Sequence, residues 1–162
     1  MAQFKDSKGT AWDLQITVEA IKRVKSALGI DLGNVHQGEP PQSARLDTDV
    51  VLLIDVIYIL LRPQAEAKGI SDVEFGESLG GDAAFAAREA FWRSLIDFFQ
   101  RFHRTDAVAA ITKQLDLVNH VIQWATQEID KIPIEEMAAK ILRSSGERST
   151  VGQALSESFQ TN

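Results

Sequence analysis

The chain has 162 residues, a formal net charge of −6 and no cysteine, and hydrophobic residues make up 44% of it. This length and balance are typical of one soluble globular domain, and the lack of cysteine excludes disulfides, cysteine-ligated metals and thiol catalysis. The acidic charge disfavours general binding to nucleic acid or to anionic membranes, because both need clustered Lys and Arg.

The first 16 residues have the pattern of a β-hairpin. Phe4 is followed by the turn sequence 6–9, which ends in glycine, and Trp12, Leu14 and Ile16 then alternate with polar residues. Because two strands alone are only marginally stable, we expect the apolar face of the hairpin to pack against helices.

The first helix is predicted to begin after Thr17, which has a capping hydroxyl, and to end at Gly29. Residues 30–46 contain two prolines and two glycines. They are therefore predicted to form a loop, and they are the first place where we expect disorder.

A second helix is predicted to start near Asp47 or Asp49, to be apolar on nearly every side through Leu61, and to end at Gly69. A helix of this kind lies at the centre of a bundle. Its apolar run, residues 50–61, would span only about 18 Å, against about 30 Å for a bilayer core. We therefore expect no membrane partner, and with no signal peptide at the start we expect a cytoplasmic protein.

Two further helices follow. Ser71 and Glu74 form a capping box that opens a short helix, and the pair of glycines at 80–81 stops it. Asp82 is predicted to cap a long helix that reaches about Phe102 and has an apolar stripe wide enough to meet two neighbours.

The helix that opens at residues 105–106 has the clearest pattern in the sequence. Its apolar residues alternate steps of three and four over more than three heptads: Val108, Ile111, Leu115, Val118, Ile122, Ala125, Ile129 and Ile132. One interpretation is core packing against the second and fourth helices. The other is that Leu117, Val121 and Trp124, which form a second line, pair with another subunit or with a partner helix.

The end of the chain is predicted to be less regular. Residues 134–143 are expected to form one more short helix, and residues 144–162 have the composition of a flexible tail, so we expect a single domain over residues 1–143. In the tail, Val151, Leu155 and Phe159 share one helical face. They form either a docking segment or a few incidental apolar residues.

No motif for catalysis, metal binding or cofactor binding stands out. The three histidines, His36, His103 and His120, have no metal-ligand spacing and are expected to be scattered over the surface. Asp55 interrupts the most apolar helix. A buried carboxylate there would indicate a functional site, whereas a carboxylate at the helix edge near solvent would not, and we favour the edge position.

A family resemblance rests on several stretches of the sequence. They are Phe4-x-Asp6-x-x-Gly9-x-x-Trp12-x-Leu14-x-Ile16-Thr17, Ile21-Lys22-Arg23-Val24, Gly29-Ile30-Asp31-Leu32, residues 49–63 and Phe75-Gly76-x-x-Leu79. Over roughly its first two-thirds the chain resembles the tail assembly chaperones of long-tailed bacteriophages. The resemblance implies a small, acidic, mostly helical protein of the bacterial host cytoplasm that binds the tape-measure protein and recruits tail-tube subunits.

We therefore expect a mainly α-helical bundle with an N-terminal β-hairpin and a flexible C-terminal tail, no enzymatic activity, no cofactor, and protein partners or a homo-oligomer. Two alternatives stay open: a structural head–tail or minor virion protein, and a small-ligand-binding or enzymatic domain centred on Asp55. Residues 1–46 carry a net charge of +1 and residues 47–162 one of −7. A partner that meets the helical part is therefore expected to be neutral or basic.

Overall fold

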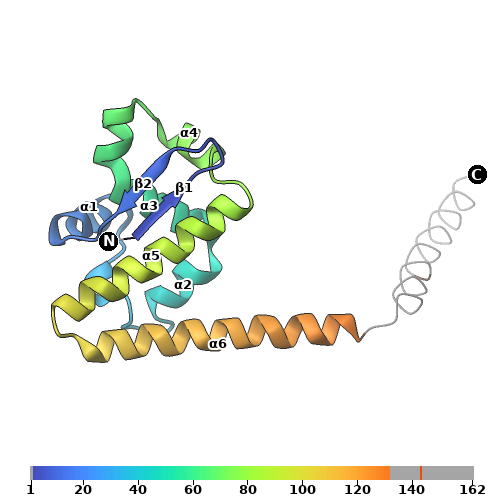
Figure 1. Cartoon of the computed structure of the whole chain (residues 1–162). Helices are drawn as coiled ribbons and strands as arrows, with labels where there is room; N and C mark the ends of the chain where they lie inside the picture. Colours follow the sequence, from blue (N-terminus) through green and yellow to red (C-terminus); the bar gives the residue numbers. More distant parts are fainter. Residues whose placement is uncertain (1, 132–142, 144–162) are drawn as a thin grey trace, which may run out of the picture. The chain divides into compact units, whose positions relative to one another are not determined.

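The computed structural model describes residues 2–131 and residue 143. This part of the chain folds into an N-terminal β-hairpin and six α-helices (Figure 1). The predicted fold class, mainly α with an N-terminal hairpin, is confirmed. The chain divides into two compact units, residues 1–116 and 117–162, and the division falls within the last helix. The predicted start of the tail at residue 144 lies outside the described residues.

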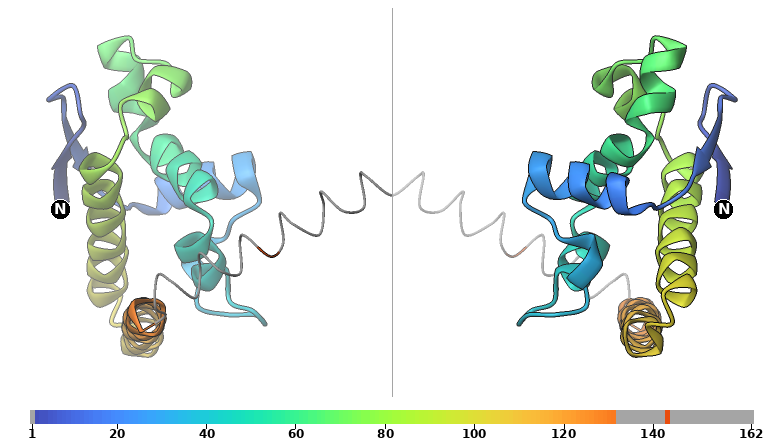
Figure 2. Two further views of the ribbon diagram at one scale, coloured as in Figure 1. Left: turned by 90° about the vertical axis from the view of Figure 1, so that its right-hand side faces the viewer. Right: turned by 90° about the vertical axis from the view of Figure 1, so that its left-hand side faces the viewer.

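The hairpin consists of β1 (Ala2–Lys5) and β2 (Ala11–Leu14), which pair antiparallel with Phe4 opposite Trp12. Both of these aromatic side chains are buried. The hairpin lies alongside α5 (Asp82–Arg101), as Figure 2 shows. There the Ser94 hydroxyl donates a hydrogen bond to the carbonyl of Leu14 at 2.8 Å. The expectation that the hairpin packs against helices is confirmed.

One buried carboxylate organises the hairpin turn. Asp6 Oδ1 accepts hydrogen bonds from the backbone N–H groups of Lys8 and Thr10, at 3.0 and 2.8 Å, and Oδ2 accepts one from the indole of Trp12 at 3.0 Å. Burial tends to raise the pKa of Asp6, but the hydrogen bonds outweigh burial and lower this pKa below its ordinary value. Gly9 follows with a φ of 84°, the left-handed conformation that favours glycine.

Both predicted ends of the first helix are confirmed. In α1 (Val18–Leu28) the Thr17 hydroxyl accepts the backbone N–H of Ala20 at 3.2 Å, and Gly29 ends the helix with a φ of 70°. The buried side chains of α1 include Val24, and the helix packs against α3 (Val50–Lys68).

The interpretation of residues 30–46 as a plain, disorder-prone loop is wrong. The segment contains a short 3₁₀ helix, η1 (Leu32–Asn34), and the start of α2 (Gln42–Thr48). Its apolar residues are anchored in the core, with Leu32, Val35 and Leu46 fully buried. Proline and glycine counts indicate turns, but they do not reveal that the apolar residues between the turns are buried.

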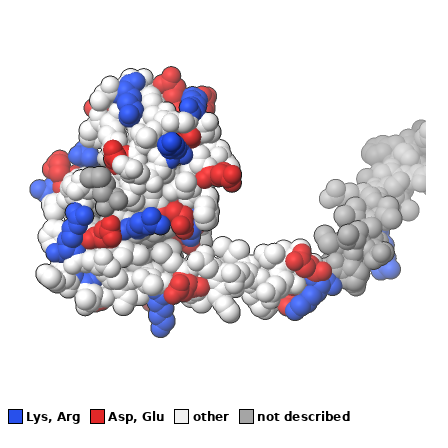
Figure 3. Space-filling view, in the orientation of Figure 1, with Lys and Arg blue, Asp and Glu red and all other residues white. Residues whose placement is uncertain are grey.

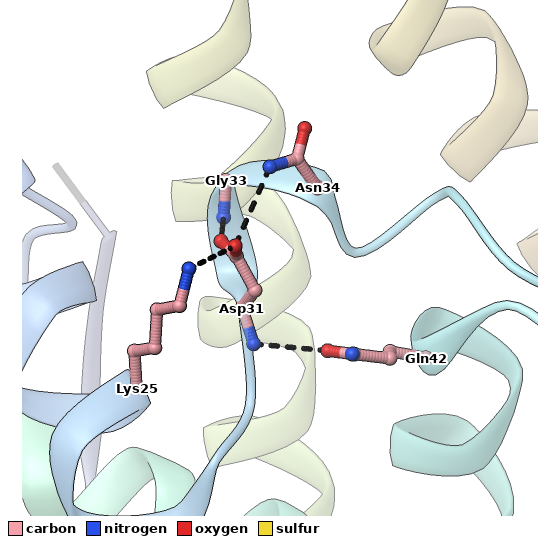
Figure 4. Close-up of polar contacts among 5 residues, drawn as sticks. All are labelled: Lys25, Asp31, Gly33, Asn34 and Gln42. Carbon is pink, nitrogen blue, oxygen red and sulfur yellow. Dashed lines mark hydrogen bonds and ion pairs between the residues drawn. The ribbon is translucent and has the colours of Figure 1, made fainter.

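Asp31 holds this segment together (Figure 4). Its carboxylate pairs with Lys25 Nζ at 2.7 Å and accepts hydrogen bonds from the backbone N–H of Gly33 and the side-chain amide of Asn34. Its own backbone N–H donates to Gln42 Oε1 at 2.9 Å, which links η1 to α2. The hydrogen bond from Lys25 is the main reason that the pKa of Asp31 is lowered.

The central helix α3 begins and ends as predicted, with Asp49 as its N-cap and Gly69, at a φ of 67°, after its last residue. Its middle is buried, but its first turn is not: Val50 is 62% exposed and Val51 72%. The prediction that this helix lies at the centre of the bundle is therefore correct for its middle and wrong for its start.

The capping box of α4 (Asp72–Glu77) is confirmed. The hydroxyl of Ser71 accepts the backbone N–H of Glu74, and the Glu74 carboxylate accepts the backbone N–H of Ser71. The predicted cap of α5 is wrong, because Asp82 is the first helical residue and Gly81 precedes it without a side-chain cap.

The last helix, α6 (Thr105–Asp130), begins at the predicted residue. No helix in the described ranges is long and apolar enough to cross a membrane. The short helix predicted for residues 134–143 lies, apart from Arg143, outside the described residues, and so do Val151, Leu155 and Phe159.

Candidate protein-binding surface

The first part of α6 is packed against the core. Ala107 and Ile111 are buried, and Val108 and Leu115 are partly buried against the same apolar cluster. The hydroxyl of Ser43, in α2, also donates a hydrogen bond to the side chain of Gln114. Core burial is therefore confirmed for this part of the helix, but its side-chain hydrogen bond is with α2 and not with the predicted second or fourth helix.

Beyond Asp116 the same helix exposes most of its large apolar side chains, whereas Val118 is partly buried. We call five of them the apolar face of α6, and their exposed fractions are 63% for Leu117, 52% for Val121, 57% for Ile122, 61% for Trp124 and 61% for Ile129. At about 100° of rotation per residue, they lie within an arc of about 160° around the helix. Leu117, Val121 and Trp124, which the sequence singled out, form one edge of this arc.

The apolar face lies in a stretch without charge. Residues 117–127 include no Asp, Glu, Lys or Arg. In Figure 3 this part of α6 is free of charged side chains on the side in view. Charges return at the end of the helix, where Lys131 pairs with Glu128. A helix that stays exposed usually has charged or polar residues around it, so an uncharged apolar arc of this length is unusual for an exposed helix.

The structure places Asp55 at the exposed edge of α3. This is the position that we favoured, and it leaves no buried carboxylate at this point for a catalytic site. Within the described ranges no group of three or more His, Cys, Asp or Glu side chains is arranged to hold a metal ion.

The histidines differ from one another. His103 and His120 are exposed, as expected for scattered surface residues. The expectation of a surface position is wrong for His36, because its side chain is only 11% exposed. Its ring meets that of Phe99 edge-on at 5.9 Å, and its Nε2 lies 3.4 Å from the guanidinium of Arg104. This packing joins η1 to the α5–α6 turn, a contact that local sequence spacing does not reveal.

Sequence reasoning also missed a groove between α3 and α4. Its walls include Val51 and Val73, which are both strongly exposed. The available signal was the presence of bulky apolar residues in the first turns of two helices, at positions 50–51 and 73.

Comparisons with protein-family models, curated proteins and solved structures found no match for this chain.

Proposed function

We propose that this protein is a non-enzymatic, protein-binding tail assembly chaperone, and that the apolar face of α6 binds an apolar helical segment of the tape-measure protein. The observation that carries the proposal is the exposure of five large apolar side chains on one uncharged helix face. Such a face suits a partner helix that presents its own apolar stripe.

The energetics favour a partner for this face. Full burial of a Val, Leu, Ile or Trp-sized apolar side chain stabilises by about 1.5–3 kcal/mol relative to exposure. The members of the apolar face, at 52–63% exposure, have yet to gain much of that stabilisation. A chaperone that covers unassembled apolar helices needs a surface of this kind.

The identity of the partner is taken from the family resemblance. The resemblance implies capture of the tape-measure protein first and recruitment of tail-tube subunits afterwards. The −7 charge of residues 47–162 supports a neutral or basic partner for the helical part.

Co-expression with the tape-measure protein encoded in the same genome tests the proposal. We expect the wild-type chain to co-purify with the tape-measure protein and to keep it in solution. A Leu117→Ser/Trp124→Ala variant should capture it at least about tenfold less well, which corresponds to the loss of about 1.4 kcal/mol. Gln123→Ala, on the opposite side of α6, is the matched control and should bind like the wild type. Equal capture by all three chains would contradict the proposal.

Two measurements separate the competing interpretations. Purified virions should contain the tape-measure protein but not this chain, and its presence at fixed stoichiometry would make it a virion component instead. Sedimentation of the wild-type chain over a range of concentrations shows whether a second copy occupies the apolar face, because a homo-oligomer would be lost in the Leu117→Ser/Trp124→Ala variant.

A further inference from the structure

The second surface of interest is the groove between α3 and α4, which we call the α3–α4 groove. Its volume is about 320 Å³. Its lining includes Val51, Ile54, Asp55 and Tyr58 from α3 and Asp72 and Val73 from α4. Because the exposed fractions of Val51 and Val73 are 72% and 64%, the groove is open to solvent between two apolar rims.

The groove rests on a rigid base. Phe75 is fully buried beneath it, with its ring 5.1 Å from that of Trp12 and 5.6 Å from that of Tyr58. Both walls begin at well-formed caps: Asp49 accepts the backbone N–H of Leu52 at 3.0 Å, and the capping box fixes the start of α4. The α3–α4 groove therefore exists before any partner binds, and this lowers the entropic cost of binding because the walls need no ordering.

The polar side of the groove is acidic. Its charged lining residues are two carboxylates, Asp55 and Asp72, and no Lys or Arg lines it. Within the described part of the chain, Asp55 makes no hydrogen bond or ion pair, and Asp72 accepts one bond, from the backbone N–H of Val73 at 2.9 Å. Helix α4 adds Glu74 and Glu77 and has no cation of its own.

These features together define a complementary ligand. At about 320 Å³ the groove is at the small end of the roughly 300–1,000 Å³ range of binding pockets, so it accommodates one bulky side chain. Within the described part of the chain, the two carboxylates at its edge have no ion-pair partner, and they favour cations next to that side chain. We propose that the α3–α4 groove docks a segment of a partner protein in which one Leu, Phe or Trp is flanked by Lys or Arg. This site is separate from the apolar face of α6 and does not depend on the proposed function.

Synthetic peptides test the proposal on the full-length chain. In the first set, a central Leu, Phe or Trp has two Lys or Arg residues on each side. The second set replaces these basic residues with Glu, and the third replaces the central residue with Ala. We expect only the first set to bind by fluorescence anisotropy, with NMR shift changes centred on Val51, Asp55 and Val73. Added salt should weaken this binding, because part of it comes from charge.

Charge-matched variants then locate the site. Asp55→Asn/Asp72→Asn should weaken binding of the basic peptides at least about tenfold, as expected when charge-assisted contacts are removed. Glu89→Gln/Asp116→Asn makes the same change in net charge at exposed positions outside the groove lining and should bind like the wild type. Because Asp55 is exposed and unpaired, Asp55→Asn alone serves as a second variant that leaves the fold intact.

Several results would overturn the proposal. It fails if no basic peptide binds, if the Glu-flanked peptides bind as well as the basic ones, or if both double variants behave alike. Tighter binding of a peptide with the sequence of residues 144–162 would make the chain's own C-terminal segment the occupant and would also overturn it. The α6 variants should leave peptide binding unchanged, so failure at this groove is distinguishable from failure of the tape-measure proposal.

Discussion

The side chain of Asp6 fixes the turn of the N-terminal hairpin and the position of the Trp12 indole. Its two carboxylate oxygens accept two backbone N–H groups of the turn and the indole N–H of Trp12. Trp12 in turn packs edge-on against Phe75, beneath the α3–α4 groove. The spacing of Asp6, Gly9 and Trp12 in the sequence is therefore explained by turn geometry and by the need of a buried indole for an acceptor.

We expect Asp6→Asn to destabilise the fold. The Asn side chain has a single acceptor oxygen, so either the turn N–H groups or the Trp12 indole would face an NH₂ group. A buried donor without an acceptor costs about 1–3 kcal/mol. Urea unfolding should show this loss, with Glu89→Gln as an exposed control that changes the free energy of unfolding by less than about 0.5 kcal/mol. A loss no larger than that of the control would show that the turn holds without the carboxylate.

The lowered pKa of Asp6 and that of Asp31 predict the pH dependence of stability. A carboxyl group whose pKa is lower in the folded state binds fewer protons there than in the unfolded chain. Its contribution is therefore complete above the ordinary carboxyl pKa of about 4 and is lost as the pH falls through the lowered value. The free energy of unfolding should fall as the pH is lowered from about 5 to about 2.

The Asp6→Asn variant should show a shallower decline over the same range, because one of the responsible carboxyl groups is absent. Unfolding curves of both proteins at a series of pH values give the comparison. Parallel declines would mean that the carboxyl group of Asp6 does not contribute to acid sensitivity.

At the scale of one element, α6 presents a single heptad pattern in two environments. Ile111 lies in this pattern at 1% exposure, and Ile122 lies in the same pattern at 57% exposure. The sequence assigned both residues to one seam, and periodicity alone could not separate them, because the pattern records which side chains are apolar and not what covers them.

Two alanine substitutions should separate the parts of α6. Ile111→Ala should lower the free energy of unfolding by about 2–5 kcal/mol, because it opens a cavity in the core. Ile122→Ala should change it by less than about 0.5 kcal/mol, since the side chain is largely in solvent. Both are measured by chemical denaturation at concentrations where the chain is monomeric. A large loss for Ile122→Ala under those conditions would show that the apolar face is covered within the chain.

At the scale of the whole molecule, an ion pair joins segments that are distant in the sequence. Asp47, at the end of α2, accepts two hydrogen bonds from the guanidinium of Arg88 in α5, and the Asp47 side chain is fully buried. Its second oxygen has no partner. In the sequence Asp47 is only one of two candidate helix starts, because nothing near it in the chain indicates that a cation 41 residues away pairs with it.

Removing the guanidinium of Arg88 should destabilise the fold. Arg88→Met leaves the Asp47 carboxylate buried without its partner and should lower the free energy of unfolding by about 3–5 kcal/mol. The double variant Asp47→Leu/Arg88→Met removes the unpaired charge and should recover much of that loss. Thermal and urea unfolding of the three proteins provide the test. A double variant less stable than Arg88→Met would mean that α2 and α5 depend on packing by the Asp47 side chain and not on its charge.

The sequence by itself determined the local structure of this protein. The hairpin, the Thr17 cap, the capping box at Ser71 and the glycine ends of α1 and α3 were all predicted, because each depends on hydrogen bonds or backbone conformations within a few residues. The second, partly apolar line of Leu117, Val121 and Trp124 was also visible in the sequence.

Only the tertiary structure decided which apolar residues are covered. It anchors residues 30–46 in the core through Leu32 and Val35, buries most of the His36 side chain against Phe99, and leaves the start of α3 exposed beside Asp55. The physical reason is that burial depends on contacts between segments far apart in the chain, whereas caps and turns depend on neighbours. The two surfaces proposed to bind partners are both places where large apolar side chains stay exposed, at positions 50, 51 and 73 and on the apolar face of α6.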